Sequence, residues 1–329
     1  MGLLPFEQRK YTILIKKESD TNPAYGKRPE DRTVEELIQN GVICLNKPQG
    51  PTSHQVADYA KKIANAEKSG HSGSLDPNVT GVLPIALNKG TRVMDVLLKA
   101  GKEYVCWMHL HKPVEKATLQ KVLQEFTGKI TQLPPRKSAV KRQERERKVY
   151  YLDILESDEQ DVLFTMGCQA GTYVRKVCHD VGKKLGVGAH MQQLVRTKAG
   201  PFHDKEWYSL QDMKDALTWY KEGNEKEIRK IIKPIEFAVT HLPKVWIFDE
   251  AVDTVCHGAN LSIPGIAKYE SDIKVTDIVA VFSLKGELVA IGEAMLDAET
   301  IEKNEKGMAI KAKKVFMNPE TYPHFKKQD

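Results

Sequence analysis

The chain has 329 residues, of which 41% are hydrophobic and 29% are charged. This composition is typical of a globular protein and excludes a disordered chain, while the length favours two domains over one. The longest apolar run, around residues 278–282, is too short to span a membrane, and the first residues lack the pattern of a secretory signal. We therefore expect a cytoplasmic protein.

Charge and cysteine content narrow the kinds of partner and site. The net charge is +6 with a pI near 8.8, which permits an anionic partner without requiring one. The five cysteines are widely scattered and form no C-x-x-C pair, so the sequence predicts neither a zinc ribbon nor a disulfide scaffold.

The first 35 residues are polar, and we expect them to form an extension that packs on another part of the protein or on a partner. The short apolar run 41–46 predicts a buried strand. Ser53 is expected to cap the helix that follows. The apolar face of this helix would carry Val56, Tyr59, Ala60 and Ile63. A glycine-rich loop is expected over residues 69–80.

The middle of the chain alternates strand and helix patterns. Residues 103–110 read as a strand with Tyr104, Cys106, Met108 and Leu110 on one face. A helix with period 3.6 is expected over 119–126, followed by paired strands at 149–155 and 162–166. Thr172 is expected to cap a further helix. Its buried stripe would be Val174, Val177, Cys178, Val181 and Leu185.

The last part of the chain changes character after a charged helical stretch at 210–232. Short apolar strands are expected at 245–248, 278–282 and 288–294, with glycine and proline between them. This pattern indicates a small separate β-rich domain. We predict an extension over 1–35, a mixed and largely antiparallel α/β domain over 36–240, and a β domain over 241–329.

A basic cluster lies between residues 136 and 148. It has seven basic and two acidic residues, a net charge of 7 − 2 = +5. Such a cluster attracts phosphates, although a solvated basic loop would have the same composition.

The segment from Gly70 to Pro84 reads GHSGSLDPNVTGVLP. Its glycines and the proline after Asp76 predict a shaped loop that presents one carboxylate. By itself this pattern is also typical of an aspartate that only forms a turn.

The whole string resembles the catalytic motif of the TruB/dyskerin family of pseudouridine synthases. Residues 41–53 (GVICLNKPQGPTS), 102–104 (KEY), 171–175 (GTYVR) and 188–202 are similar to the other motifs of that family, in the same order. Residues 133–142 resemble the archaeal and eukaryotic branch, and the region after 243 resembles a PUA domain, a compact β-barrel that binds RNA. Ser74, Lys137 and Val174 depart from the residues most common in the family.

The resemblance implies isomerisation of uridine in RNA without a metal or a cofactor. Asp76 would be the catalytic carboxylate, either attacking C1′ or abstracting a sugar proton. Arg175 would pair with it through a bidentate fork, and Tyr104 would stack on the uracil. His71 would hold the extruded nucleotide, which costs about a few kcal/mol to unstack. Val174 and Leu194 would line the uracil pocket.

The resemblance also implies RNA contacts and partners. Lys47, Lys141 and Arg142 would contact phosphates, and His257 and Gly258 would bind RNA in the PUA domain. The partners implied are an H/ACA guide RNA with its substrate RNA, small accessory proteins of that ribonucleoprotein, and tRNA as a further substrate. No membrane is implied.

Three readings remain open from the sequence. The chain is a guide-dependent enzyme within a ribonucleoprotein, a standalone enzyme acting on the T-loop uridine of tRNA, or a non-catalytic RNA-binding scaffold. The string Ser138–Arg142 and the PUA features favour the first, and the presence of Asp76, Tyr104 and Arg175 argues against the third.

Overall fold

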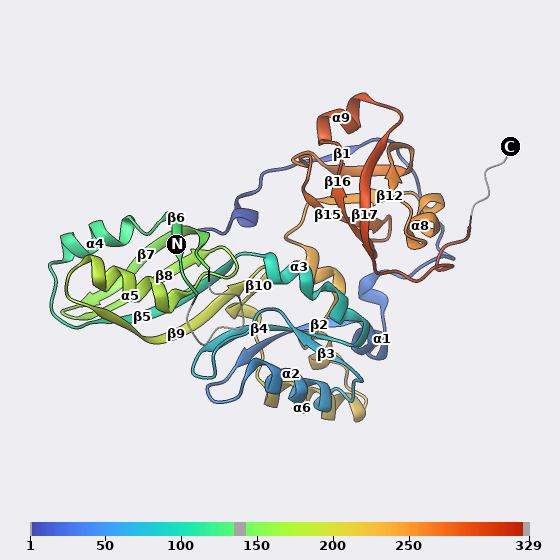
Figure 1. The fold of residues 1–329 in the computed structure, drawn as a ribbon. Coiled ribbons are helices and arrows are strands. Elements are labelled where there is room, and N and C mark those ends of the chain that lie inside the picture. Colours follow the sequence, from blue (N-terminus) through green and yellow to red (C-terminus); the bar gives the residue numbers. More distant parts are fainter. Residues whose placement is uncertain (1, 135–142, 325–329) are drawn as a thin grey trace. The chain divides into compact units, whose positions relative to one another are not determined.

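The computed structural model describes residues 2–134 and 143–324 (Figure 1). The chain forms two compact units. The first holds the chain up to Gln8 and again from Ile38 to Ile232, and the second holds Arg9–Leu37 and the chain from Lys233 onward. Helix α1 (Val34–Asn40) and strand β11 (Ile232–Pro234) contain two of the points where the chain passes from one unit to the other.

The first unit is built on a large mixed sheet with neighbouring strands in the order β2-β4-β9-β5-β8-β7-β6. Every pair along this path is antiparallel except β4 and β9, which run parallel. Strand β3 pairs with β4, and β10 pairs with β9. The strands are β2 (Gly41–Lys47), β3 (Ser69–His71), β4 (Thr80–Leu87), β5 (Lys102–Leu110), β6 (Gly128–Gln132), β7 (Arg145–Asp158), β8 (Asp161–Cys168), β9 (Ala189–Ala199) and β10 (Phe202–His203).

Helices cover parts of this sheet. A hydrophobic core joins β5 and β8 to α4 and α5, and it includes Cys106, Phe164, Leu119 and Val177. The other helices of the unit are packed around β2, β3 and β4 or follow them in the chain. The helices are α2 (Ser53–Ile63), α3 (Met94–Lys99), α4 (Lys116–Gln124), α5 (Val174–Lys184), α6 (Leu210–Lys221) and α7 (Lys226–Ile231).

Two expected helix caps are wrong. Helix α2 is capped by Thr52, whose hydroxyl accepts from the backbone N–H of Gln55 in a capping box, and Ser53 is already the first helical residue. Tyr59 is 42% exposed, so it does not belong to the buried face of α2. Helix α5 has no side-chain cap, because the Thr172 hydroxyl donates to the carbonyl of Gln169 instead.

The second unit is built on a seven-stranded sheet in the order β1-β14-β12-β15-β16-β17-β13. Strands β12 and β15 run parallel and the other pairs are antiparallel. Its core includes Val245, Tyr269, Val281 and Ile310. The elements are β1 (Ile13–Ile15), β12 (Lys244–Ile247), α8 (Asp249–Cys256), β13 (Leu261–Ser262), β14 (Ile266–Glu270), β15 (Ile278–Ser283), β16 (Leu288–Ala294), α9 (Ala298–Lys303) and β17 (Met308–Val315).

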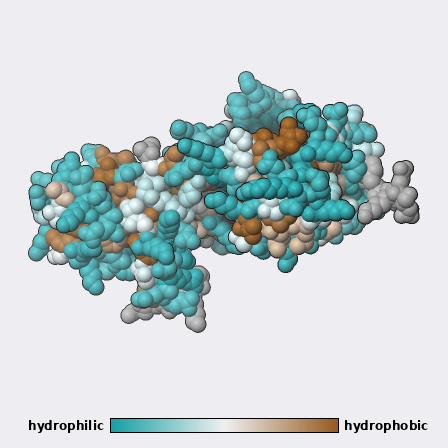
Figure 2. All heavy atoms as spheres, turned by 90° about the horizontal axis from the view of Figure 1, so that it is seen from above, coloured by the Kyte–Doolittle hydropathy of each residue, from teal (hydrophilic) through white to brown (hydrophobic). Residues whose placement is uncertain are grey.

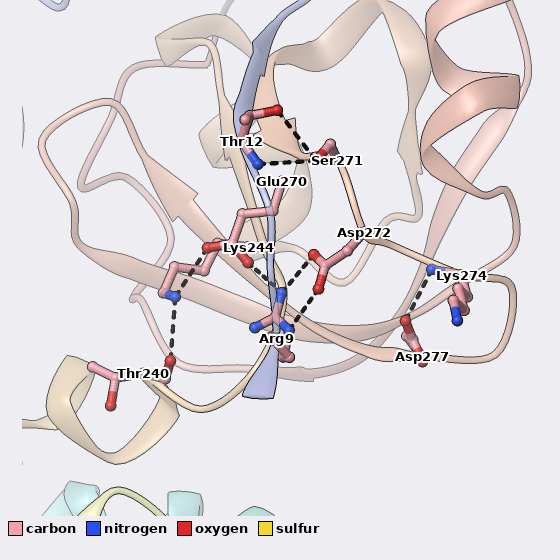
Figure 3. A network of polar contacts seen from close by, with 9 residues as sticks. All are labelled: Arg9, Thr12, Thr240, Lys244, Glu270, Ser271, Asp272, Lys274 and Asp277. Carbon is pink, nitrogen blue, oxygen red and sulfur yellow. Dashed lines mark hydrogen bonds and ion pairs between the residues drawn. The ribbon is translucent and has the colours of Figure 1, made fainter. Parts of the chain in front are cut away.

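The N-terminal extension supplies the edge strand β1 of this second sheet. Figure 3 shows how the extension is fastened beside β14: Arg9 contacts Glu270 at 2.5 Å and Asp272 at 2.7 Å. The backbone N–H of Thr12 donates to the Ser271 hydroxyl at 2.9 Å. Residues 2–8, by contrast, belong to the first unit, so the extension is divided between the two.

Hydrophilic side chains cover most of the face drawn in Figure 2, and the hydrophobic residues on it form small separate patches. No helix in the described ranges is both long enough and apolar enough to cross a bilayer.

Candidate active site on the loop between β3 and β4

The loop that carries Asp76 is held by Ser53, the first residue of α2. The backbone N–H of Leu75 donates to the Ser53 hydroxyl at 2.8 Å, and the carbonyl of Leu75 lies 3.3 Å from the same oxygen. A further backbone bond runs from Gly50 to the carbonyl of Pro77 at 2.9 Å. These bonds fix the backbone on both sides of Asp76.

Lys47, the last residue of β2, completes this support. Its side chain is buried, and its ammonium donates to the carbonyls of Pro48, Pro77 and Val79 at 2.8, 3.1 and 2.9 Å. Burial lowers the pKa of Lys47, while the charge of Asp76 opposes that shift. All three ammonium protons have backbone acceptors. We therefore revise the predicted phosphate contact, because the Lys47 ammonium binds the backbone of the Asp76 loop instead.

Asp76 and Arg175 meet, as the sequence predicted. An Arg175 amino group donates to the Asp76 carboxylate, and both side chains remain more than half exposed, at 56% for Arg175 and 58% for Asp76. Arg175 lies in the first turn of α5. The buried Gln132 of β6 fixes the start of that helix, because its side-chain amide bonds both the N–H and the carbonyl of Tyr173.

An apolar cluster adjoins this ion pair. Leu75 and Val79 of the loop, Val174 of α5 and Leu194 of β9 belong to one core, with Tyr104 of β5 packed against it. Burial raises the pKa of the Tyr104 hydroxyl, although the guanidinium of Arg196 nearby opposes the shift. The site thus combines a solvent-accessible ion pair, a cluster of apolar side chains and one aromatic ring.

Arg196 is a structural residue of the site that the sequence analysis did not single out. It is 1% exposed, and its guanidinium donates to the carbonyl of Val82 at 2.7 Å and that of Gly73 at 3.2 Å. A buried arginine requires acceptors for its donors, and these carbonyls flank the Asp76 loop. An arginine within the otherwise half-buried strand 189–199 was the signal available in the sequence.

His71 ends β3 beside a separate pocket of about 700 Å³. Its ring packs edge-on against His54, with 4.6 Å between ring centroids. Among the described residues neither ring nitrogen has a hydrogen-bond partner. Burial, with the charge of His54 as a further cause, lowers the pKa of His71 to about 4. The ring is therefore neutral near pH 7. The pocket also contains Gly73 and Ser74 of the Asp76 loop.

The predicted RNA contacts lie elsewhere. His257 follows the C-terminal end of α8 in the second unit, is 57% exposed, and contacts the backbone and carboxylate of Asp253 at 2.9 and 3.5 Å. Gly258 comes next, with open space where a Cβ would lie. Lys141 and Arg142 lie outside the described residues. Of the basic cluster, Arg147 lies against Gly171, close before the helix that carries Arg175.

Family models match nearly the whole chain. A TruB family pseudouridylate synthase N-terminal domain matches residues 61–174, and a tRNA pseudouridylate synthase B C-terminal domain matches residues 175–240. A PUA domain matches residues 243–316, and a DKCLD (NUC011) domain matches residues 3–57.

Relatives and solved structures agree with these matches. The probable tRNA pseudouridine synthases B of Methanopyrus kandleri and Nanoarchaeum equitans are each 51% identical over 321 residues, covering 97% of this chain and 95% and 92% of their own. A chain in the crystal structure of a Cbf5–Nop10–Gar1 complex is 52% identical with a TM-score of 0.93, covering 98% of this chain and 99% of that one. A chain of an H/ACA ribonucleoprotein bound to a substrate RNA containing 2′-deoxyuridine is 50% identical with a TM-score of 0.91, over the same shares.

The fold and these matches define an RNA-modifying isomerase with an appended PUA domain. The chain belongs to the TruB family of pseudouridine synthases, the enzymes that convert uridine in RNA to pseudouridine. This confirms the predicted family, the mixed α/β fold class with its PUA domain, and the predicted enzyme class.

Proposed function

We propose that this chain is the catalytic subunit of an H/ACA guide ribonucleoprotein and isomerises rRNA uridines that a guide RNA selects by base pairing. The proposal is supported by the likeness over 98% of the chain to a protein solved with Nop10 and Gar1, and to one in an H/ACA ribonucleoprotein bound to substrate RNA. The partners would be the guide RNA, the substrate RNA and small accessory proteins of this kind.

The observation that carries the catalytic assignment is the pairing of Asp76 with Arg175 beside the apolar cluster. In the reaction the bond from C1′ to N1 breaks, a bond from C1′ to C5 forms, and the proton on C5 is lost while N1 gains one. Asp76 would act at the ribose, as nucleophile on C1′ or as the base that removes a sugar proton. Arg175 would orient the carboxylate. Supplying a fixed carboxylate in a prearranged loop reduces the reorganisation that the reaction needs.

The remaining site residues fit the handling of a base. Tyr104 would stack on the uracil, and Val174 and Leu194 would form the apolar wall beside it. His71, neutral and without a protein partner among the described residues, would contact the nucleotide taken out of its stack.

RNA outside the site would be bound by positive charge and by the second unit. Arg145, Arg147 and Lys148 at the start of β7 remain from the basic cluster, and Arg147 lies next to the turn before Arg175. His257 and Gly258 would contact RNA in the PUA domain. Lys141 and Arg142, which lie outside the described residues, would also contact phosphates.

A second substrate, tRNA, is favoured by the relatives from Methanopyrus kandleri and Nanoarchaeum equitans, both called probable tRNA pseudouridine synthase B. The target there would be the T-loop uridine. These relatives are archaeal, and archaeal tRNA and rRNA lie in the cytoplasm, where we also place this chain.

Release of tritium from RNA containing 5-³H-uridine tests the proposal, because the proton on C5 leaves only when the new bond forms. Wild type and Asp76→Asn are each given tRNA alone, and substrate RNA with a guide RNA and the accessory proteins. We expect release by wild type in both mixtures and a loss of more than about 1,000-fold in Asp76→Asn, since the carboxylate chemistry is gone.

The RNA requirement separates the two substrates. Release only with guide RNA and accessory proteins would mean that the enzyme catalyses the guided reaction and does not act on tRNA by itself. Release only with tRNA would mean that it acts as a standalone tRNA-modifying enzyme. Tight guide-RNA binding by wild type without release in any mixture would show a non-catalytic scaffold and overturn the catalytic assignment.

A further inference from the structure

Glu103 is a buried carboxylate on β5, next to Tyr104 but on the opposite face of the strand, since side chains alternate along a strand. It is 6% exposed. The Tyr151 hydroxyl donates to one of its oxygens, the Thr197 hydroxyl donates to the other at 2.8 Å, and the Lys198 ammonium lies 3.5 Å away. A charge buried at this depth persists only with such partners.

The pairing of β5 with β9 changes register at this point. Glu103 lies opposite Lys198, while Tyr104 lies opposite Arg196, so Thr197 is an extra residue on β9 and forms a β-bulge. The Thr197 side chain is buried, and its hydroxyl is the one bound to Glu103. Glu103 therefore binds the bulged residue directly.

The bulge decides which side chain faces the active site. In a regular antiparallel ladder Thr197 would lie opposite Tyr104, and Arg196 would be turned to the other face of the sheet. With the bulge, Arg196 shares the face of Tyr104 and reaches the carbonyls of Gly73 and Val82 on either side of the Asp76 loop.

We propose that Glu103 is a positioning residue for uridine isomerisation: by fixing the Thr197 bulge it holds Arg196, and through Arg196 the loop of Asp76, in the reactive arrangement. This inference rests on the proposed function. The side chains that bind the Glu103 carboxylate are Tyr151, Thr197 and Lys198, so Glu103 acts through β9 and not on the substrate itself.

The first residues of the chain complete the network. Lys198 also pairs with Glu7, at 2.9 and 3.2 Å, which holds this lysine beside Glu103. The ring of Tyr151 lies against Gly2 and Gly167, where an added Cβ would come within 2.1 and 2.2 Å of the ring. Burial, and then the bond to Glu103, raise the pKa of Tyr151, so its hydroxyl stays a donor. Residues 2–8 thereby pack against two of the side chains that bind Glu103.

The test compares Thr197→Val with Thr197→Ser in the full chain. Valine keeps the shape and loses the donor to Glu103, whereas serine keeps the donor. We expect the single-turnover rate of tritium release, with guide RNA and accessory proteins, to fall about 10- to 100-fold in Thr197→Val and to stay within about threefold of wild type in Thr197→Ser, as for a misplacement of about 1 Å. The dissociation constant for RNA should be unchanged in both.

Glu103→Gln is expected to behave like Thr197→Val, because the amide cannot accept from all three donors. Glu156, an exposed carboxylate on β7, the strand that also carries Tyr151, supplies the matched control: Glu156→Gln should keep the wild-type rate. If Glu103→Gln does not fold, the comparison of Thr197→Val with Thr197→Ser alone tests the positioning role. Wild-type rates in Thr197→Val and Glu103→Gln, even with lowered melting temperatures, would leave Glu103 a purely structural residue and overturn the proposal.

Amide hydrogen exchange separates this proposal from the proposed function. We expect residues 72–82 to exchange faster in Thr197→Val and Glu103→Gln than in wild type and Thr197→Ser, whether or not any mixture shows activity. Unchanged exchange in this segment would overturn the positioning role. Absence of wild-type tritium release with faster exchange would overturn only the proposed function.

Discussion

His71 is a histidine that the fold keeps neutral. Burial lowers its pKa from 6.5 to about 4, so the unfolded chain binds a proton that the folded chain refuses between these values. The stability linked to this histidine is therefore complete above about pH 6.5 and declines as the pH falls toward 4, by at most about 1.4 kcal/mol per pH unit. We expect His71→Leu to lose less stability than wild type between pH 6.5 and 4.5, measured as the urea midpoint at several pH values.

His179→Leu is the control for that experiment. His179 is 64% exposed on α5, so its replacement shows what removing a surface histidine does to the urea midpoint at each pH. Parallel curves for wild type and His71→Leu would contradict a buried, neutral His71.

Single residues show where sequence reasoning reaches its limit. The pairing of Asp76 with Arg175 was predicted from two recognisable motifs. Thr52 and Ser53 are adjacent hydroxyls that suit a cap equally well, and only the position of the Asp76 loop gives Ser53 its other role. For Lys47, the phosphate contact was implied by the family resemblance, and no local pattern shows that its ammonium binds carbonyls 1 to 32 residues away in the chain.

At the scale of elements, the parallel contact of β4 with β9 depends on Gly81. This glycine has φ of +109°, and an added Cβ would lie 2.3 Å from the carbonyl oxygen of Arg196 and 2.7 Å from its backbone nitrogen. We expect Gly81→Ala to cost more than about 2 kcal/mol of unfolding free energy, since backbone strain and a clash with β9 add together. Chemical denaturation measures the loss.

Gly50→Ala isolates the strain from the clash. Gly50 has the same φ of +109° but nothing within 4 Å of an added Cβ. Its substitution should cost about 1 kcal/mol, the strain alone. Equal losses in the two variants would mean that β9 gives way at Arg196 and that the contact is looser than described.

Elements were predictable where their own periodicity determines them. The alternation in β5 and the buried stripe of α5 follow from local patterns of period 2 and 3.6, and both are as expected except at the cap of α5. The bulge at Thr197 was not predictable, because register is a property of two strands about 90 residues apart and neither strand carries a local signal for it.

At the scale of the whole molecule, each compact unit is built from two segments that are separated in the sequence. A boundary near residue 240 was expected from composition, and the C-terminal segment of the second unit begins at Lys233. The split of the extension after Gln8 was not predicted, although residues 2–8 (GLLPFEQ) are mostly apolar and residues 9–37 are largely polar. Long-range partners decide it: Glu7 pairs with Lys198 in the first unit, whereas Arg9 pairs with Glu270 in the second.

Glu270 makes the second unit dependent on the extension. Its carboxylate is 1% exposed and accepts from both Arg9 and Lys244, at 2.5 and 3.0 Å (Figure 3). Removing one charge from a buried group of this kind leaves the others uncompensated, so we expect Glu270→Gln to cost about 3 kcal/mol and to speed amide exchange in β1 and β14. Lys16 of the same extension pairs with Glu305, which is 87% exposed. Glu305→Gln should therefore cost less than about 1 kcal/mol of unfolding free energy. Similar small losses in both variants, with unchanged exchange in β1, would show that strand pairing alone holds the extension and that the buried charges add nothing.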